Sequence, residues 1–257
     1  GSLTDTQDIA VTVTNVYEQP VITSNSGGDT ASVNVAENST AVTTVTSIID
    51  STGTGKTYSI TGGADAALFT INASTGALSF VSAPDFENKL DAGTNNVYDV
   101  TVQVSDGAGG IDTQAIAVTV TNVNEAPVIT SNGGGTTAAV SVAENSTAVT
   151  TVTSTDVDAG ATATYSIVGG VDSTKFNINA STGALSFKTA PNREIPTDSG
   201  SNNVYDVKVQ VSDGSLTDTQ DIAVTVTNVY EEPVINSNGS GTTAAVNVAE
   251  NSTAVTT

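Results

Sequence analysis

The sequence predicts an all-β protein made of β-sandwich domains that follow one another in a linear array. Two observations carry this prediction. Identical motifs recur about every 107 residues, which is the size of a whole domain and far above the roughly 20–50 residues of a solenoid repeat. Between these motifs, Val, Ile and Tyr alternate with polar residues, while Gly, Asn and Asp mark turns, a pattern typical of half-buried antiparallel strands.

The repeated motifs define the expected domains. Glu-Asn-Ser-Thr begins at Glu37, Glu144 and Glu250, and Thr-Gly-Ala-Leu-Ser-Phe occupies both 75–80 and 182–187. The predicted units are the end of one repeat at 1–18, complete repeats at 19–125 and 126–232, and the start of another at 233–257.

The first 22 residues repeat a later part of the chain. Residues 1–22 match 214–235 at every position except Gln19, which aligns with Glu232. We therefore expect the chain to be an excerpt from a longer tandem array.

In the first repeat, the strands can be read in order. Val33 and Val35 begin a short strand that 37–40 interrupts, and the apolar alternation is not kept afterwards. Such a break is typical of an edge strand that switches between the two sheets. Residues 98–104 and 116–120 alternate apolar and polar side chains, as expected for two longer strands.

Turn residues separate these strands, and the second repeat has the same pattern. Asp106-Gly107 offers a hairpin turn after the first long strand, and Gly62-Gly63 marks another turn. The second repeat has its two long strands at 205–211 and 222–226, with Gly169-Gly170 as the matching turn.

The composition excludes several functions. The 257 residues include 6 Lys+Arg against 27 Asp+Glu, a net charge of −21, and no Cys or His. This rules out disulfides and His- or Cys-based metal sites, and such a charge repels nucleic acid. Catalysis lacks its usual general bases and cations, so we expect no enzyme. No apolar run reaches the roughly 18–20 residues needed to span a membrane.

The acidic residues recur at fixed places, which are expected to be strand ends. Carboxylates brought together at one end of a sandwich repel one another unless a cation lies between them, and Lys and Arg are too few to supply it. A donor set made only of oxygen atoms suits Ca²⁺. The sequence therefore predicts bound calcium, although no motif matches an EF-hand loop. A glycosidase pair, Asp85 with Glu87, lacks the sugar cleft and aromatic platforms that such enzymes use.

In combination, the acidic motifs resemble those of a known family. They occur in the order found in cadherins: Ala-Glu-Asn at 36–38 and 143–145, Asp-Phe-Glu at 85–87, Asp-Gly at 106–107 and 213–214, Asn-Val-Asn-Glu-Ala-Pro at 122–127, and Asp-Val-Asp-Ala-Gly at 156–160. The chain resembles a bacterial cadherin-like tandem repeat of a giant secreted or cell-surface adhesin. The resemblance implies immunoglobulin-like Greek-key β-sandwiches with calcium bound between successive domains.

The resemblance also implies a ligand set at the junction of the two repeats. The first repeat and the linker would supply Glu37, Asp85, Glu87, Asn122, Asn124 and Glu125. The second repeat would supply Asp156, Asp158 and Asp213.

Other junctions depart from this pattern. Ile49 and Ser51 stand in the first repeat where the second has the two carboxylates of Asp-x-Asp, with Asp50 between them. Asn192 replaces the Asp of Asp-x-Glu in the second repeat, and Tyr17 and Tyr230 replace the linker asparagine. We expect unequal joints, either by drift or as deliberately weak joints.

The resulting interpretation is a non-enzymatic, extracellular adhesive or structural segment stiffened by calcium, on the cell surface or secreted, serving adhesion or biofilm attachment. Its partners would be neighbouring repeats, other copies of the protein or polysaccharide. The alternative is a calcium-dependent carbohydrate-binding module, which usually needs exposed aromatic rings. Tyr98 and Tyr205 keep the core phase, so that only Tyr17 and Tyr230 are expected to be free.

Overall fold

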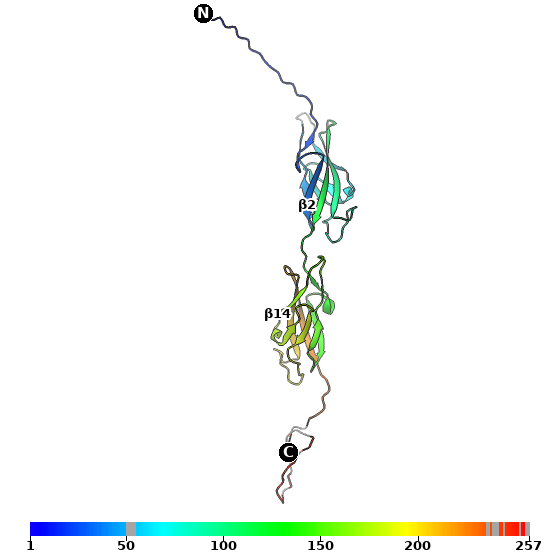
Figure 1. The fold of residues 1–257 in the computed structure, drawn as a ribbon, viewed down its shortest axis with the longest axis vertical. Helices are drawn as coiled ribbons and strands as arrows, with labels where there is room; N and C mark the ends of the chain where they lie inside the picture. Colours follow the sequence, from blue (N-terminus) through cyan, green and yellow to red (C-terminus); the bar gives the residue numbers. More distant parts are fainter. Residues whose placement is uncertain (50–54, 235–236, 238–241, 244, 252, 255–257) are drawn as a thin grey trace. The chain divides into compact units, whose positions relative to one another are not determined.

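The chain folds into two separate β-domains. The computed structural model describes residues 1–49, 55–234, 237, 242–243, 245–251 and 253–254. Two compact units divide the chain, Gly1–Asn124 and Glu125–Thr257, and each contains one β-sandwich (Figure 1). We call the sandwiches the first and the second domain.

Strands of different lengths and the 3-10 turn η1 make up the described part of the first domain. Its elements are β1 Val21–Ile22, β2 Thr30–Ala36, β3 Ala41–Thr44, β4 Ser47–Ile48, β5 Thr57–Gly62, η1 Ala66–Leu68, β6 Phe69–Ile71, β7 Ala77–Phe80, β8 Val97–Ser105 and β9 Ile111–Thr121. One sheet has the order β2-β9-β8-β5 and the other β3-β7-β6, while β1 pairs with β4.

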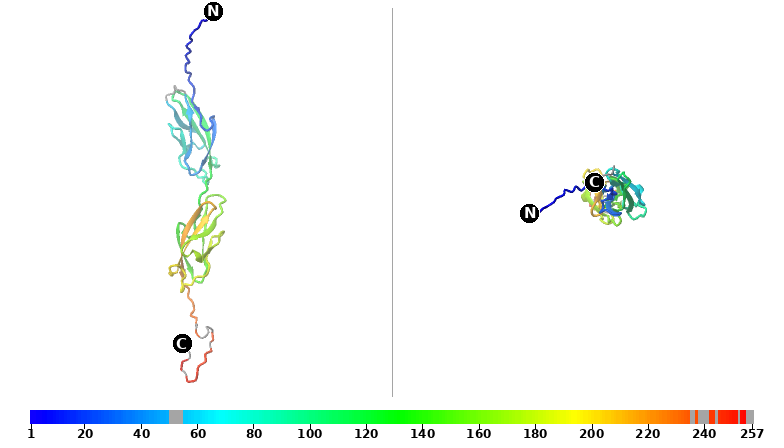
Figure 2. Two further views of the ribbon diagram at one scale, coloured as in Figure 1. Left: turned by 90° about the vertical axis from the view of Figure 1, so that its left-hand side faces the viewer. Right: turned by 90° about the horizontal axis from the view of Figure 1, so that it is seen from above.

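The second domain repeats this arrangement. Its elements are β10 Val128–Ile129, η2 Ser131–Gly133, β11 Thr137–Ala143, β12 Ala148–Thr151, β13 Ser154–Thr155, β14 Thr164–Gly169, η3 Ser173–Lys175, β15 Phe176–Ile178, β16 Ala184–Phe187, β17 Val204–Ser212 and β18 Thr217–Thr227. The sheets are β11-β18-β17-β14 and β12-β16-β15, with β10 paired to β13. In both domains the long strands run along the long axis of the sandwich (Figure 2).

The edge strand that was expected to switch sheets does so. β2 lies at the edge of the larger sheet, and β3, after a turn at residues 37–40, lies at the edge of the smaller sheet. One expectation was wrong in detail, because the sandwich is not wholly antiparallel: β2 pairs with β9 in parallel, from Thr30 opposite Ala115 to Ala36 opposite Thr121. The chain enters each domain at one end and leaves at the other, so its first and last long strands run in the same direction when they are neighbours.

Alternating side chains form each core, as the sequence predicts. Along β8, Tyr98, Val100, Val102 and Val104 are at most 1% exposed, and the corresponding residues of β17 are equally buried. In the first domain Phe80 stacks on Phe69 at 4.5 Å between ring centroids and meets Tyr98 edge-on at 5.2 Å. Each domain thus has its own apolar core.

The expected glycine turn after β5 is present and has a steric cause. Gly63 has φ +106°, and a Cβ there would collide with the backbone of Asp99 and Val100. Gly170 occupies the same conformation in the second domain, against Asp206 and Val207. Only glycine allows the chain to pass this close to the neighbouring strand.

Candidate metal-binding poles

Each domain has two ends, which we call poles. The C-terminal pole of the first domain is formed by the turn at 37–40 after β2, the loop 84–90 and the segment 122–124 after β9. The N-terminal pole of each domain contains the hairpin after β8 or β17, and in the second domain also the loop before β14. The acidic motifs lie at these poles, because they occupy the turns and loops that connect the ends of the strands.

Glu37 organises the C-terminal pole of the first domain. Its side chain is only 3% exposed. One carboxylate oxygen, Oε2, accepts a hydrogen bond from the backbone N–H of Phe86, and Oε1 accepts one from Val123, both at 2.8 Å. The glutamate therefore fastens the Asp-Phe-Glu loop to the segment after β9.

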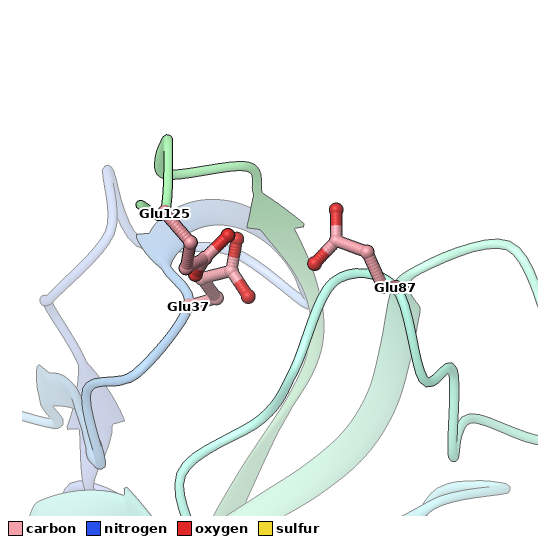
Figure 3. Close-up of side chains that lie close together, drawn as sticks. All are labelled: Glu37, Glu87 and Glu125. Carbon is pink, nitrogen blue, oxygen red and sulfur yellow. The ribbon is translucent and has the colours of Figure 1, made fainter. Parts of the chain in front are cut away.

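Three of the predicted ligands converge at this pole. Carboxylate oxygens of Glu37, Glu87 and Glu125 all lie within 4.8 Å of one another. Figure 3 shows Glu37 and Glu125 side by side, with Glu87 reaching toward them from the neighbouring loop. Negative groups at this spacing repel one another, and a bound cation would relieve this repulsion.

The other predicted residues of this pole lie beside the cluster. Asp85 is exposed, and its Oδ1 accepts hydrogen bonds from the backbone N–H groups of Glu87 and Asn88 at 3.0 and 2.9 Å. The carboxylate that a glycosidase pair would need thus caps the loop that carries Glu87. Asn122 and Asn124 are exposed on the segment after β9.

The N-terminal pole of the second domain holds the remaining predicted ligands. The Oδ1 atom of Asp156 accepts a hydrogen bond from the N–H of Asp158 at 3.0 Å, and Oδ2 of Asp158 accepts one from the N–H of Glu125 at 2.8 Å. The Oδ1 atom of Asp213 caps its hairpin by accepting the N–H groups of Ser215 and Leu216 at 2.6 and 2.7 Å. All three aspartates are half-buried.

The donor chemistry of these two poles fits calcium. Their side chains offer only carboxylate and amide oxygens, with neither nitrogen nor sulfur ligands from His or Cys. Hard divalent cations such as Ca²⁺ take about 6–8 such oxygens in a flexible arrangement. The basic residue nearest to Glu87 in the sequence, Lys89, lies over the ring of Phe86 at 6.0 Å from its centroid.

The C-terminal pole of the second domain has the same framework with fewer acidic groups. Glu144, 2% exposed, accepts the N–H groups of Arg193 and Val229 at 2.8 Å each, just as Glu37 does in the first domain. These backbone hydrogen bonds, that from Val229 first, and the charge of Arg193 hold the pKa of Glu144 below its usual range. Asn192 stands where the first domain has an aspartate, and its Oδ1 caps Ile195.

The N-terminal pole of the first domain corrects one expectation. Tyr17, expected to be free, donates its hydroxyl hydrogen to Oδ2 of Asp106 at 2.5 Å. The tyrosine lowers the pKa of the Asp106 carboxyl, together with backbone donors of the hairpin. Ile49 is half-buried at this pole, while Asp50 and Ser51 lie outside the described residues. The other tyrosine expected to be free, Tyr230, is 83% exposed.

Sequence reasoning missed this contact, although a signal for it was available. Gly110 follows Asp106 in the hairpin at the place where the second repeat has Leu216. A side chain at Gly110 would collide with the Tyr17 hydroxyl, so the glycine and the tyrosine belong together. The two differences lie 93 residues apart in the sequence, and only the fold brings them to one place.

Sequence reasoning also missed a set of buried aspartates with a structural role. Asp65, 5% exposed, accepts the N–H groups of Ala92 and Asp99 at 2.7 and 2.8 Å. Asp91 accepts those of Asn95 and Asn96. These carboxylates hold the long loop before β8, and Asp172 and Asp198 do the same in the second domain.

The comparisons with known proteins agree with this architecture. Residues 138–227, most of the second domain, match the family model of the cadherin domain. A crystal structure of human protocadherin-24 EC1-2 is similar with a TM-score of 0.52 and 21% identity, over 82% of this chain and 99% of that one. A structure of PcdhgB3 EC1-4 matches with a TM-score of 0.51 and 22% identity, over 82% of this chain and 50% of that one. At this identity the likeness shows the fold.

Further solved structures are similar over part of their own length. The match to mouse cadherin-23 EC22-24 has a TM-score of 0.46 at 23% identity and extends over 82% of this chain and 65% of that one. It covers 52% of each of two protocadherin gamma structures. No curated protein matches the sequence. Among the described residues, no helix has the length and apolar character required to cross a bilayer.

Proposed function

We propose that this chain is a calcium-stiffened, non-enzymatic segment of an extracellular adhesin or filament, in which Ca²⁺ bound between successive domains sets their orientation. Cadherin domains as a class are extracellular adhesion repeats that generally bind Ca²⁺, and the second domain matches their family model. The bacterial origin, the role in adhesion or biofilm attachment and a secreted or cell-surface location belong to this proposal. Neighbouring repeats and other copies of the protein are its expected partners.

One observation carries the proposal: the oxygens of Glu37, Glu87 and Glu125 lie within 4.8 Å of one another. Two backbone N–H groups of the first domain donate hydrogen bonds to Glu37 and so hold its carboxylate at this pole. Glu87 is carried by the loop that Asp85 caps. The folded chain thus prepares a carboxylate cluster whose repulsion a divalent cation relieves.

The linker connects this cluster with the second domain. Glu125 is held through its own N–H by Asp158, the second aspartate of Asp-x-Asp. In the proposed site Glu37, Asp85, Glu87, Asn122, Asn124 and Glu125 would hold calcium together with Asp156, Asp158 and Asp213. Bound calcium would supply the positive charge that keeps these carboxylates together and so restrain the linker.

Calcium titration calorimetry tests the proposal, with a matched pair of variants. Glu87→Gln removes one charge from the cluster, whereas Glu194→Gln removes the equivalent charge at the other C-terminal pole, where Asn192 and Arg193 stand. We expect Glu87→Gln to weaken calcium binding at least tenfold and Glu194→Gln to leave the tightest binding step unchanged. Equal affinity in the wild type and Glu87→Gln would contradict the site.

A second candidate function, calcium-dependent binding of polysaccharide, has one observation in its favour. Tyr230 is 83% exposed and offers an aromatic face of the kind that sugars pack against. Binding of a soluble polysaccharide to the wild type, lost in Tyr230→Ala, would favour this function over a purely structural one.

A further inference from the structure

The two N-terminal poles are built differently. We infer that the N-terminal pole of the first domain is closed by the side chain of Tyr17 in place of a metal ion, so that the chain contains two chemically distinct kinds of joint. This inference rests on the proposed function only in taking the junction between the two domains as the calcium-binding kind. The hydrogen bond itself is independent of calcium.

Protein donors already engage both carboxylate oxygens of Asp106. The Oδ1 atom accepts the N–H groups of Ala108 and Gly110 at 2.8 and 2.9 Å, and Oδ2 accepts the hydroxyl of Tyr17 at 2.5 Å. The residue is only 1% exposed. A cation at Oδ2 of Asp106 would compete with the hydroxyl of Tyr17, whose charge-assisted hydrogen bond to this oxygen is part-buried and among the stronger kinds.

Gly110 makes room for the tyrosine. A Cβ at this position would collide with the Tyr17 hydroxyl, the Asp106 carboxylate and the ring of Pro20. Gly110 is not among the residues with positive φ, so space and not backbone conformation requires glycine here. Leu216 is the equivalent residue of the second domain. The carbonyl of Gly110 accepts the N–H of Asp106, and the carbonyl of Leu216 accepts the N–H of Asp213.

Three differences between the poles therefore occur together. The first domain combines a linker tyrosine, a hairpin glycine and the apolar Ile49, and the second combines Asn124, Leu216 and the carboxylate of Asp156. Each set is chemically consistent. The first supplies a hydroxyl donor with the space it needs and has the apolar Ile49 at the position where the second has the carboxylate of Asp156.

The C-terminal pole of the second domain fits the tyrosine kind of joint. Residues 1–22 match 214–235 except at one position, which makes Tyr230 the equivalent of Tyr17. The pole beside Tyr230 carries Arg193, whose N–H binds Glu144 and whose charge lowers the pKa of that carboxyl. A permanent side-chain cation thus stands at this pole, where the other C-terminal pole has Phe86.

The first test removes only the hydroxyl. Hydrogen exchange of the full chain, resolved by peptide, is measured for Tyr17→Phe in calcium and in chelator. We expect faster exchange around Asp106 and a melting temperature of the first domain lower by about 5 °C, with the same change in both conditions. Tyr230→Phe is the matched control, because Tyr230 is 83% exposed, and it should change neither. An unchanged first domain in Tyr17→Phe would overturn the inference.

A double-mutant cycle tests the fit of tyrosine and glycine. Gly110→Ala should lower the melting temperature of the first domain in the wild-type background and lower it less in Tyr17→Ala, where the collision with the hydroxyl is gone and only those with Asp106 and Pro20 remain. Equal effects in both backgrounds would show that the two residues do not share this space and would overturn the inference.

A third measurement separates this inference from the calcium proposal. The ring ¹³Cζ signal of Tyr17, assigned with Tyr17→Phe, should stay in place during a calcium titration, while signals near Asp158 move. If the Tyr17 signal shifts with calcium, a metal competes for Asp106 and the inference fails. If no signal moves near Asp158, the proposed calcium site fails. The effects of Tyr17→Phe in chelator then still show whether Tyr17 closes the pole of the first domain.

Discussion

Oδ2 of Asp158 accepts the backbone N–H of Glu125 at 2.8 Å, so that an aspartate of the Asp-x-Asp loop holds the linker residue whose own carboxylate lies beside Glu37 and Glu87. The backbone N–H of Glu125 thus binds Asp158, while its side chain lies beside Glu37 and Glu87. This arrangement explains why the linker and the Asp-x-Asp loop are expected to respond to calcium together.

The contact predicts the effect of changing Asp158. Asp158→Ala removes both the acceptor for the Glu125 N–H and a carboxylate of the proposed site, so interdomain rigidity in calcium should fall markedly in small-angle scattering. Asp50→Ala, at the position between Ile49 and Ser51 where the first repeat lacks Asp-x-Asp, should leave it unchanged. Equal losses from both changes would contradict unequal joints.

Glu37 is expected to matter for stability even without calcium. Glu37→Ala leaves the N–H groups of Phe86 and Val123 without their side-chain acceptor, and since both bonds are part-buried, we expect a loss of about 1–3 kcal/mol in all. The melting temperature of the first domain in chelator should fall by about 10 °C. Asp29→Ala, at an exposed position, is the control and should change it little. A wild-type melting temperature in Glu37→Ala would show that these bonds contribute nothing.

Acid should destabilise the second domain through Glu144. Its pKa in the folded state is lowered, by the N–H groups of Val229 and Arg193 and by the Arg193 charge. The folded state therefore prefers the ionised form. The resulting stability is present above the ordinary pKa of 4.5 and is lost as the pH falls through the lowered folded value.

Unfolding of the second domain in chelator between pH 7 and pH 3 measures this effect. Glu144→Gln should reduce the acid-induced loss of stability, while Asp221→Asn, which removes a carboxylate from a partly exposed ion pair with Lys208, should not. Identical pH profiles for the wild type and Glu144→Gln would contradict the role of Glu144.

Much of this fold can be predicted from the sequence because its signals are local. The alternation in β8 and β9, the Asp-Gly hairpin and the sheet switch after β2 each follow from neighbouring residues. The parallel pairing of β2 with β9 could not be predicted in this way, since it depends on where the chain enters and leaves the domain.

The candidate site shows the same division. The repeated acidic motifs indicate which carboxylates belong to the site. They do not indicate that one oxygen of Asp85 caps its own loop, or that the buried Glu37 accepts two N–H groups. The bond from Tyr17 to Asp106 escaped prediction because a tyrosine in a linker usually suggests an exposed ring. Such contacts depend on residues far apart in sequence.

Calcium should also stabilise the folded chain. Binding to the native state alone adds about 2.7 kcal/mol at a hundredfold excess of calcium over Kd. Chelator should lower the melting temperature while circular dichroism retains its β signal, because each domain has its own core. A melting temperature that does not differ between calcium and chelator would contradict calcium binding.

The proposed calcium-dependent joining of the two domains can be measured by NMR relaxation of the full chain in calcium and then in chelator. We expect both domains to share one rotational correlation time in calcium and to show two shorter, independent times in chelator. Independent tumbling in saturating calcium, or joint tumbling that chelator leaves unchanged, would contradict calcium-dependent joining.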